Sequence, residues 1–145
     1  MTKRNLFLLG VLILAQLVYA GNWDDTKAQA KQENKLILLK FSGSDWCGPC
    51  IQLQKVIIDD PVFEQFAHEK LVLFKADFPR QKKNQLPKEQ QTINDQLAET
   101  YNPEGEFPCM VLIDAQGNTL RKWHGYDKKH TVQDYMADVN AFINK

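Results

Sequence analysis

The sequence carries no excess of positive charge. Its 145 residues include 18 lysines and arginines against 18 aspartates and glutamates, so the formal net charge is zero at pH 7. Proteins that bind nucleic acid use clustered basic side chains to neutralise phosphates. No such patch stands out along this chain, and we therefore exclude nucleic acid as its partner.

Cysteine and histidine are also scarce. The chain has three of each, and the histidines do not lie at the spacing that a zinc site would need beside a cysteine pair. We therefore expect no resident metal and no cofactor. An odd number of cysteines leaves at least one thiol unpaired within the chain. A domain of this length can bury a core without disulfide staples.

Long apolar runs are missing except at the N-terminus. Two basic residues precede the apolar stretch 6–20, which ends in Val18-Tyr19-Ala20. A basic start, a short apolar segment and small residues at the cleavage point are typical of a signal peptide. We therefore predict a signal peptide at residues 1–20 and one domain at residues 21–145. An uncleaved membrane anchor is the alternative, although the run is shorter than the ~20 residues of a spanning helix.

A signal peptide predicts export, and we expect the periplasm, with secretion or N-terminal anchoring as alternatives. The first cysteine is Cys47, so none stands at the cleavage point for lipid attachment. Removing residues 1–20 would take away two basic side chains and leave the mature chain mildly acidic. In an oxidising compartment, an exposed cysteine pair is either a structural bridge or a redox pair kept in balance by a partner.

Apolar and polar segments follow one another in the order expected of an α/β domain. We predict strands at residues 36–41, 71–77, 109–113 and 119–124, and helices at 24–34, 51–58, around 63–67, around 93–101 and at 132–143. Helical segments separate the first two strands, which predicts a parallel, right-handed crossover. A turn joins the last two, which predicts an antiparallel hairpin. The polar stretch 78–91 is predicted to be a long solvated loop, with a partner-binding element as the alternative.

The chemistry of the chain is concentrated just after the first strand, at Trp46-Cys47-Gly48-Pro49-Cys50. If a helix follows directly, Cys47 lies at its start and Cys50 within its first turn, where the two sulfurs can meet. The N–H groups of a first turn lack partners within the helix and carry partial positive charge, which favours thiolate over thiol. Cys47 is therefore the candidate nucleophile and Cys50 the candidate resolving thiol.

This motif, opening a helix within that order of elements, closely resembles thioredoxin. Phe107-Pro108, just before a strand, resembles the family's cis-proline loop, and Gly125 resembles its C-terminal glycine. The resemblance covers residues 22–145. It implies a thioredoxin fold, in which helices flank a central mixed β-sheet.

Two further segments are similar to an exported bacterial branch of that superfamily. They are residues 41–47 and Asp77-Phe78-Pro79-Arg80, and the branch is related to the thioredoxin-like domains of disulfide-reducing and protein-folding systems. The resemblance implies a thiol–disulfide oxidoreductase that reduces protein disulfides. An exported reductase needs electrons delivered across the membrane, so we expect a membrane disulfide reductase as the electron donor, and we expect a monomer.

The same resemblance assigns roles around the cysteine pair. Trp46, Gly48 and Pro49 belong to the motif, and Phe107 and Pro108 are expected beside it, where the backbone of Phe107 can pair with an extended substrate segment. Two other functions stay open. One is a module that binds clients or a partner through the Phe107-Pro108 face and holds a static disulfide. The other is an exported copper or zinc handler that uses both cysteines and a histidine.

Lys40 and Cys109 depart from the thioredoxin pattern. Thioredoxin has a buried aspartate late in its first strand that assists proton transfer to the resolving cysteine, and the matching position here is Lys40. We expect the nearby Asp45 to be a surface carboxylate rather than a base. Cys109 follows Pro108, where thioredoxin usually has threonine. It is most simply a small core residue, and the alternative is a thiol close enough to Cys50 to form another bridge or to be oxidised.

Overall fold

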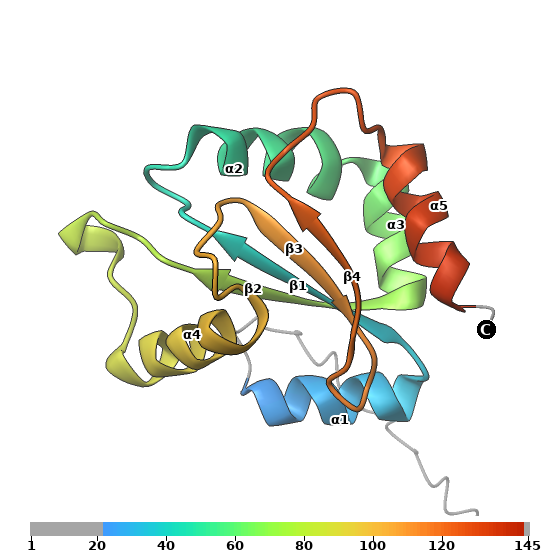
Figure 1. Cartoon of the computed structure of the whole chain (residues 1–145), viewed down its shortest axis with the longest axis horizontal. Helices are drawn as coiled ribbons and strands as arrows, with labels where there is room; N and C mark the ends of the chain where they lie inside the picture. Colours follow the sequence, from blue (N-terminus) through green and yellow to red (C-terminus); the bar gives the residue numbers. More distant parts are fainter. Residues whose placement is uncertain (1–21, 144–145) are drawn as a thin grey trace, which may run out of the picture.

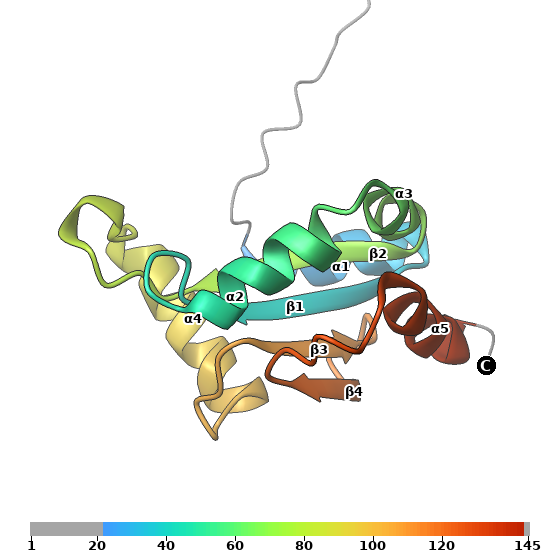
Figure 2. The ribbon, with the colours of Figure 1, turned by 90° about the horizontal axis from the view of Figure 1, so that it is seen from above.

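A mixed four-stranded sheet forms the centre of the molecule in the computed structural model, which describes residues 22–143. The strands lie in the order β2-β1-β3-β4, as Figure 2 shows. They are β1 (Leu36–Ser42), β2 (Leu71–Asp77), β3 (Cys109–Ile113) and β4 (Thr119–His124). The first pair is parallel, and β3 runs antiparallel to both its neighbours. The predicted crossover strands and C-terminal hairpin are confirmed, whereas the predicted signal peptide lies outside the described residues.

Helices cover both faces of the sheet (Figure 1). They are α1 (Trp23–Glu33), α2 (Gly48–Leu53), α3 (Pro61–Lys70), α4 (Lys88–Tyr101) and α5 (Val132–Ile143). A π-helical turn, η1 (Gln54–Ile58), continues α2, and a short 3₁₀ turn, η2 (Lys82–Asn84), precedes α4. Within residues 22–143, no helix is long and apolar enough to cross a membrane.

Local sequence signals set where the helices begin. The Asn22 side chain caps α1 by accepting the Asp24 N–H at 3.1 Å. Asp60 does the same for α3, accepting the Val62 N–H at 2.9 Å directly before Pro61. At α5, Thr131 and Asp134 bond to each other's backbone N–H groups. This reciprocal pair is a capping box, as the sequence predicts.

The sheet separates two apolar cores. One lies against α2, η1, α3 and α5, and includes Leu38, Leu53 and Met110. The other lies against α1 and α4, and includes Leu39, Phe41 and Cys109. Alternate residues of β1 point to opposite faces, and almost the whole strand is buried. This is the covered central strand that its unbroken apolar sequence predicts.

The prediction of a loop across residues 78–91 was wrong in part, because α4 begins at Lys88 and η2 forms a single turn before it. Lys88-Glu89-Gln90-Gln91 is polar and yet favours helix, since long unbranched side chains lose little freedom in a helix. Helix α4 therefore begins before Ile93, the first apolar residue of the predicted helix. The parallel strands β1 and β2 end at the same edge of the sheet, and the segments that leave this edge build the site (Figure 1).

Candidate functional site

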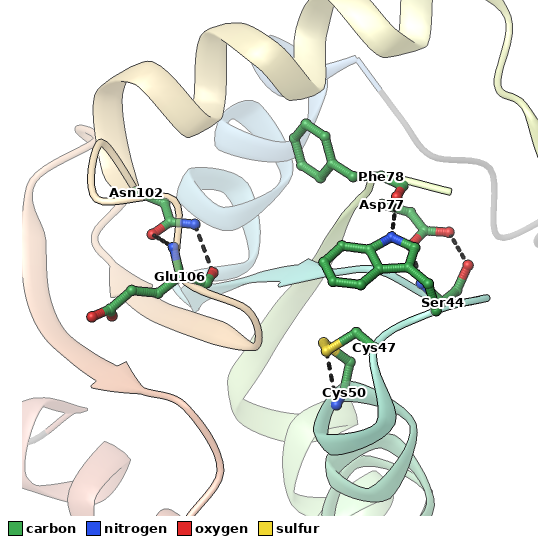
Figure 3. The surroundings of a disulfide bond; sticks show 8 residues. Ser44, Cys47, Cys50, Asp77, Phe78, Asn102 and Glu106 are labelled. Carbon is green, nitrogen blue, oxygen red and sulfur yellow. Dashed lines mark hydrogen bonds between the residues drawn. A yellow bond between two sulfur atoms is a disulfide. The ribbon is translucent and has the colours of Figure 1, made fainter. Parts of the chain in front are cut away.

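Cys47 and Cys50 form a disulfide at the start of α2 (Figure 3). Cys47 is the N-cap residue, and its Sγ accepts the Cys50 N–H at 3.3 Å. The two Cα atoms lie 5.2 Å apart. Both cysteines are buried, whereas Gly48 and Pro49 between them are exposed. The helix start therefore places both sulfurs together beneath an exposed turn and directs the Cys50 backbone N–H at the Cys47 sulfur, as the sequence predicts.

Trp46 lies against the segments that flank the disulfide. Its indole N–H donates to the Phe78 carbonyl at 2.8 Å, and its ring meets the Phe107 ring edge-on with centroids 5.4 Å apart. Gly43 makes this position available, since a Cβ atom there would lie 2.2 Å from the indole ring. The structure thus brings together the predicted motif residue Trp46 and the predicted loop residue Phe107.

The loop before β3 is held from two sides. The Phe107-Pro108 peptide bond is cis, and the Pro108 carbonyl accepts the Gly125 N–H at 2.9 Å. Gly125 has φ of 69°, a left-handed conformation that favours glycine. Asn102 is buried and bonds to the backbone N–H and carbonyl of Glu106, at 3.1 and 2.9 Å (Figure 3). Sequence reasoning did not single out Asn102 and missed this positioning contact.

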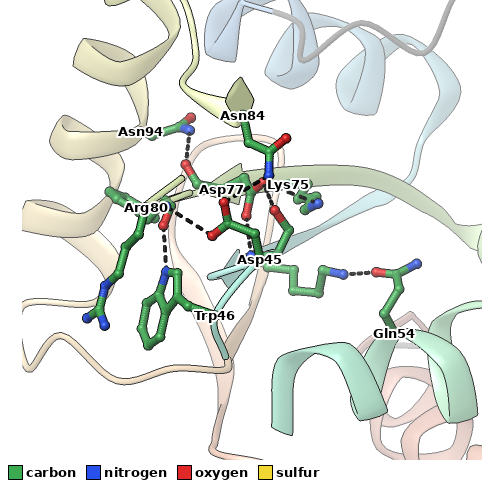
Figure 4. A network of polar contacts seen from close by, with 11 residues as sticks. Asp45, Trp46, Gln54, Lys75, Asp77, Arg80, Asn84 and Asn94 are labelled. Atoms are coloured by element: carbon green, nitrogen blue, oxygen red, sulfur yellow. Dashed lines mark hydrogen bonds and ion pairs between the residues drawn. The ribbon is translucent and has the colours of Figure 1, made fainter. Parts of the chain in front are cut away.

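Two aspartates fasten the loops around the motif (Figure 4). Asp77, at the end of β2, accepts the Ser44 N–H at 3.0 Å, and its carbonyl accepts the Asn94 side chain from α4 at 2.9 Å. Asp45 accepts the backbone N–H groups of Arg80 and Gln81, at 2.9 and 3.0 Å. The Arg80 N–H is the largest of several hydrogen bonds that lower the pKa of Asp45. Asp45 is therefore a half-buried carboxylate that holds a loop, which agrees with the expectation that it is no base.

Lys40 carries a buried amine next to α2, the helix that begins at the cysteine pair. Its side chain lies on the α2 face of β1, the residue is only 6% exposed, and Nζ donates to the Gln54 side-chain oxygen. Gln54 follows Cys50 by one turn, since its backbone N–H donates to the Cys50 carbonyl. Burial is the main cause that lowers the pKa of Lys40 to about 8, and the nearby Lys75 adds to it. The Lys40 amine therefore has a partly neutral population near pH 8.

Cys109 is a free thiol, fully buried at the start of β3. It belongs to the core beneath α1 and α4, whereas α2 packs on the other face through Leu53. Burial raises the pKa of the Cys109 thiol to about 11. The simple interpretation as a small core residue agrees with this placement, and the disulfide present joins Cys47 to Cys50. Among the residues described, no group of three or more histidine, cysteine or acidic side chains is arranged to hold a metal ion.

Comparison with known proteins gives related sequences and structures. The disulfide bond reductase DsbH of Chlamydia pneumoniae is 42% identical over 93 residues, which cover 64% of this chain and 54% of that protein. The thioredoxin-related protein DsbJ of the same organism is 26% identical over 97 residues, covering 67% of this chain and 27% of that protein. The matches therefore span about half the length of the first relative and about a quarter of the second.

Solved structures extend the likeness to nearly the whole chain. A DsbH oxidoreductase structure has a TM-score of 0.75 at 30% identity and covers 99% of this chain and 95% of its own. A disulphide isomerase from Xylella fastidiosa has a TM-score of 0.60 at 18% identity, covering 80% of this chain and 86% of its own. The second likeness concerns the fold alone. The model of the thioredoxin-like domain family matches residues 23–140. With the thioredoxin fold and these relatives in place, the chain belongs to the thioredoxin-like domain family.

Proposed function

We propose that this chain is a thiol–disulfide oxidoreductase that reduces protein disulfides through Cys47 and Cys50. One observation carries the proposal: Cys47 caps α2, accepts the Cys50 N–H at 3.3 Å and forms a disulfide with Cys50. A thiolate at this position gains from the N–H group and from the partial positive charge of the helix start. The likeness to a disulfide bond reductase and to a DsbH oxidoreductase structure supports the same activity.

The reaction proceeds in two balanced exchanges. The Cys47 thiolate attacks one sulfur of the substrate disulfide, a mixed disulfide forms, and the other substrate sulfur leaves as a thiolate that takes a proton. Cys50 then loses its proton and attacks the Cys47 sulfur, which releases the second substrate thiol. The substrate gains two electrons, and the chain is left with the Cys47–Cys50 disulfide. An external dithiol must return the two electrons before the next turnover.

The remaining site residues have supporting roles in this proposal. Trp46 and Phe107 pack against each other beside the disulfide, and Gly48 and Pro49 leave an exposed turn over the cysteines. The Phe107-Pro108 segment directly precedes β3, and we propose that a substrate strand pairs with the backbone of the partly exposed Phe107. A protein disulfide presented in an extended segment is the substrate that this arrangement suits.

The proposed setting is outside the cytoplasm. The signal peptide expected at residues 1–20 would export a single domain of residues 21–145, with the periplasm as destination. An oxidising compartment supplies substrate disulfides but no reducing power, and a membrane disulfide reductase is therefore the proposed electron donor. The chain is proposed to act as a monomer.

Insulin-disulfide reduction with dithiothreitol tests the activity, since the freed B chain precipitates and scatters light. We expect the wild type to accelerate precipitation and Cys47→Ala to leave only the rate of dithiothreitol alone. Cys109→Ala is the matched control, because it removes a cysteine that lies outside the site. Equal rates for the wild type and Cys47→Ala would remove the proposal. In cells, Cys50→Ala should trap the substrate as an unresolved mixed disulfide on Cys47.

The second candidate, a client-binding module with a static disulfide, differs in reduction potential. A structural bridge should lie below about −300 mV, whereas a working pair lies above it. Equilibration of the wild type with glutathione or dithiothreitol buffers measures this value. The exposed turn at Gly48 and Pro49 favours the working pair, because it leaves the disulfide reachable from one side.

A further inference from the structure

The loop between β2 and α4 carries three cationic side chains, one of which lies against Trp46, the residue before Cys47. We call residues 78–84 the Arg80 loop; it carries Arg80, Lys82 and Lys83, all three exposed. The Arg80 guanidinium lies over the Trp46 ring, 3.7 Å from its centroid (Figure 4). Trp46 directly precedes Cys47. The cationic group closest to the motif along this loop is therefore stacked on the residue next to the proposed nucleophile.

The Arg80 loop is fixed in place rather than loosely attached. Asp45 accepts the backbone N–H groups of Arg80 and Gln81 and the Asn84 side chain, at 2.9, 3.0 and 2.9 Å. The Phe78 carbonyl accepts the Trp46 indole N–H at 2.8 Å. These bonds tie both ends of the loop to the segment that carries the cysteines. Asp45 bonds the backbone of the loop, and among residues 22–143 it forms no ion pair with the Arg80 guanidinium.

The charges of the Arg80 loop have no carboxylate partner within ion-pair distance among residues 22–143. The acidic side chains on the opposite flank of the site are already paired, Glu104 with Lys122 at 3.2 Å and Glu106 with His124. This cationic loop lies beside Trp46, the residue that precedes the proposed nucleophile. It attracts anionic groups that approach the disulfide.

The Arg80 loop also borders an open hollow of about 430 Å³. Its walls include the rings of Trp46, Phe78 and Phe107 and the Arg80 side chain. The Phe78 and Phe107 rings meet edge-on, with centroids 5.5 Å apart. When an arginine lies over an aromatic ring, its N–H groups point outward, parallel to the ring. There they can bond a carboxylate through two hydrogen bonds. Aromatic rings and a guanidinium without an ion-pair partner in the described residues together suit a polypeptide segment with an acidic side chain.

We propose that the Arg80 loop is a selecting surface that favours substrate disulfides flanked by acidic residues. The proposal rests on the proposed reductase function and names the substrate class of the same site. The acidic side chain bonds Arg80 while its neighbouring cysteine lies over the Cys47–Cys50 pair. Lys82 and Lys83 add attraction at longer range, which raises the rate of encounter more than the strength of the final complex.

A single-exchange assay tests this selection. Reduced Cys50→Ala protein is mixed with one of two peptide disulfides, each a homodimer linked through one cysteine, with either glutamates or lysines flanking that cysteine. Cys47 attack releases one peptide thiol and leaves the other peptide attached, which mass spectrometry follows with time. Each rate is divided by the rate of 2-mercaptoethanol with the same peptide, so that the intrinsic reactivity of the peptide cancels.

We expect the normalised rate for the acidic peptide to exceed that for the basic peptide on the order of tenfold at low ionic strength. The ratio should fall towards one in 1 M salt, where charges are screened within about 3 Å. Arg80→Met should lower the ratio roughly threefold, and Arg80→Glu should lower it further. Lys31→Met and Lys31→Glu are the matched controls, because exposed Lys31 lies in the last turn of α1, at the opposite end of the sheet.

Each other result decides against the selection. Equal normalised rates in the wild type would overturn it, and so would a change in Lys31→Glu as large as that in Arg80→Glu, since overall charge would then be the cause. 2-Hydroxyethyl disulfide, which is small and uncharged, distinguishes a failure of the selection from a failure of the reductase function. If Cys47 attacks it while the peptide ratio is one, the reductase function stands and the selection falls. If Cys47 attacks neither, the reductase function fails and the selection fails with it.

Discussion

The three cysteines occupy two regions that treat the same side chain in opposite ways. Cys47 and Cys50 lie at the start of α2, where a backbone N–H group points at sulfur and the turn above is exposed. Cys109 lies at the start of β3, enclosed by apolar side chains that raise its pKa to about 11. Cys109 is nevertheless adjacent in sequence to a residue of the site, since Pro108 directly precedes it. The difference teaches that the surroundings of a thiol, a helix start in one region and an apolar core in the other, decide whether it can react, rather than its distance from the site along the sequence.

The two regions are expected to differ most in the rate at which their thiols are alkylated. In the reduced protein at pH 8, we expect iodoacetamide to modify Cys47 at least about 10³-fold faster than Cys109. A thiol with a pKa of about 11 is ionised in only about one molecule per thousand at this pH. Burial adds a further delay, because the core must open before the reagent enters. Peptide mapping of samples quenched at intervals measures both rates.

The control for this comparison is the unfolded chain. In denaturant, all three thiols should be modified at similar rates, because the helix start and the core are both lost. Cys109 modified within the same interval as Cys47 in the folded protein would contradict the contrast and would place the third thiol back among the redox groups.

The fold and the centre of the site could be predicted from sequence because each depends on a local signal. The apolar run 36–41 specifies a covered strand, and a cysteine at a helix start specifies the placement of its own sulfur. Thr131 and Asp134 specify the start of α5 in the same way. Such signals act within one or two turns of chain, so a single sequence contains all that they need.

The surroundings of the site could not be predicted because they depend on contacts between distant segments. Asp45 meets Arg80 35 residues further along the chain, and Ser44 meets Asp77 across 33 residues. Nothing in the composition of residues 78–91 indicates that an exposed arginine will stack on Trp46. The buried amine of Lys40 is similar, since its partner Gln54 is identified only once α2 is packed against β1. Sequence reasoning thus located the two sulfurs. It missed the hydrogen bonds that hold the surrounding loops and the position of the cationic side chains on them.

The second prediction concerns the packing of Cys109. Cys109→Ala should lower the free energy of unfolding by about 1 kcal/mol through the lost sulfur contacts, and Cys109→Ser by about 2 kcal/mol, because a buried hydroxyl without a partner adds a desolvation cost. Both variants should keep the wild-type rate of insulin reduction. Chemical denaturation measures the stability, with the midpoint and slope fitted separately.

Val is the matched size control at this position, since it fills a comparable volume with apolar atoms. Cys109→Val should be the least destabilised of the three variants. A variant that keeps its stability but loses insulin reduction would break the comparison, because it would give the β3 thiol a part in the chemistry.

The smallest effect is expected from the buried amine of Lys40, which lies beneath α2 in the region of Cys47 and Cys50. Lys40 lies beneath α2, hydrogen-bonded to Gln54, and its folded pKa of about 8 is below the unfolded value of about 10.4. A base with a depressed folded pKa binds fewer protons when folded, so its contribution to stability rises with pH between about 8 and 10.4 and is least favourable below pH 8. Lys40→Met should therefore raise the free energy of unfolding at pH 7, by about 1 kcal/mol after the loss of the Gln54 bond.

This gain should shrink as the pH rises from 7 to 10, because the wild-type amine becomes neutral and ceases to oppose folding. Lys70→Met is the control, since Lys70 is exposed at the end of α3 and should show no such trend. Denaturation curves for the three proteins at pH 7, 8.5 and 10 give the difference directly. A gain that is constant with pH would mean that Met packs better than Lys for reasons of shape alone. A gain that fades would assign the effect to the positive charge of the buried Lys40 amine.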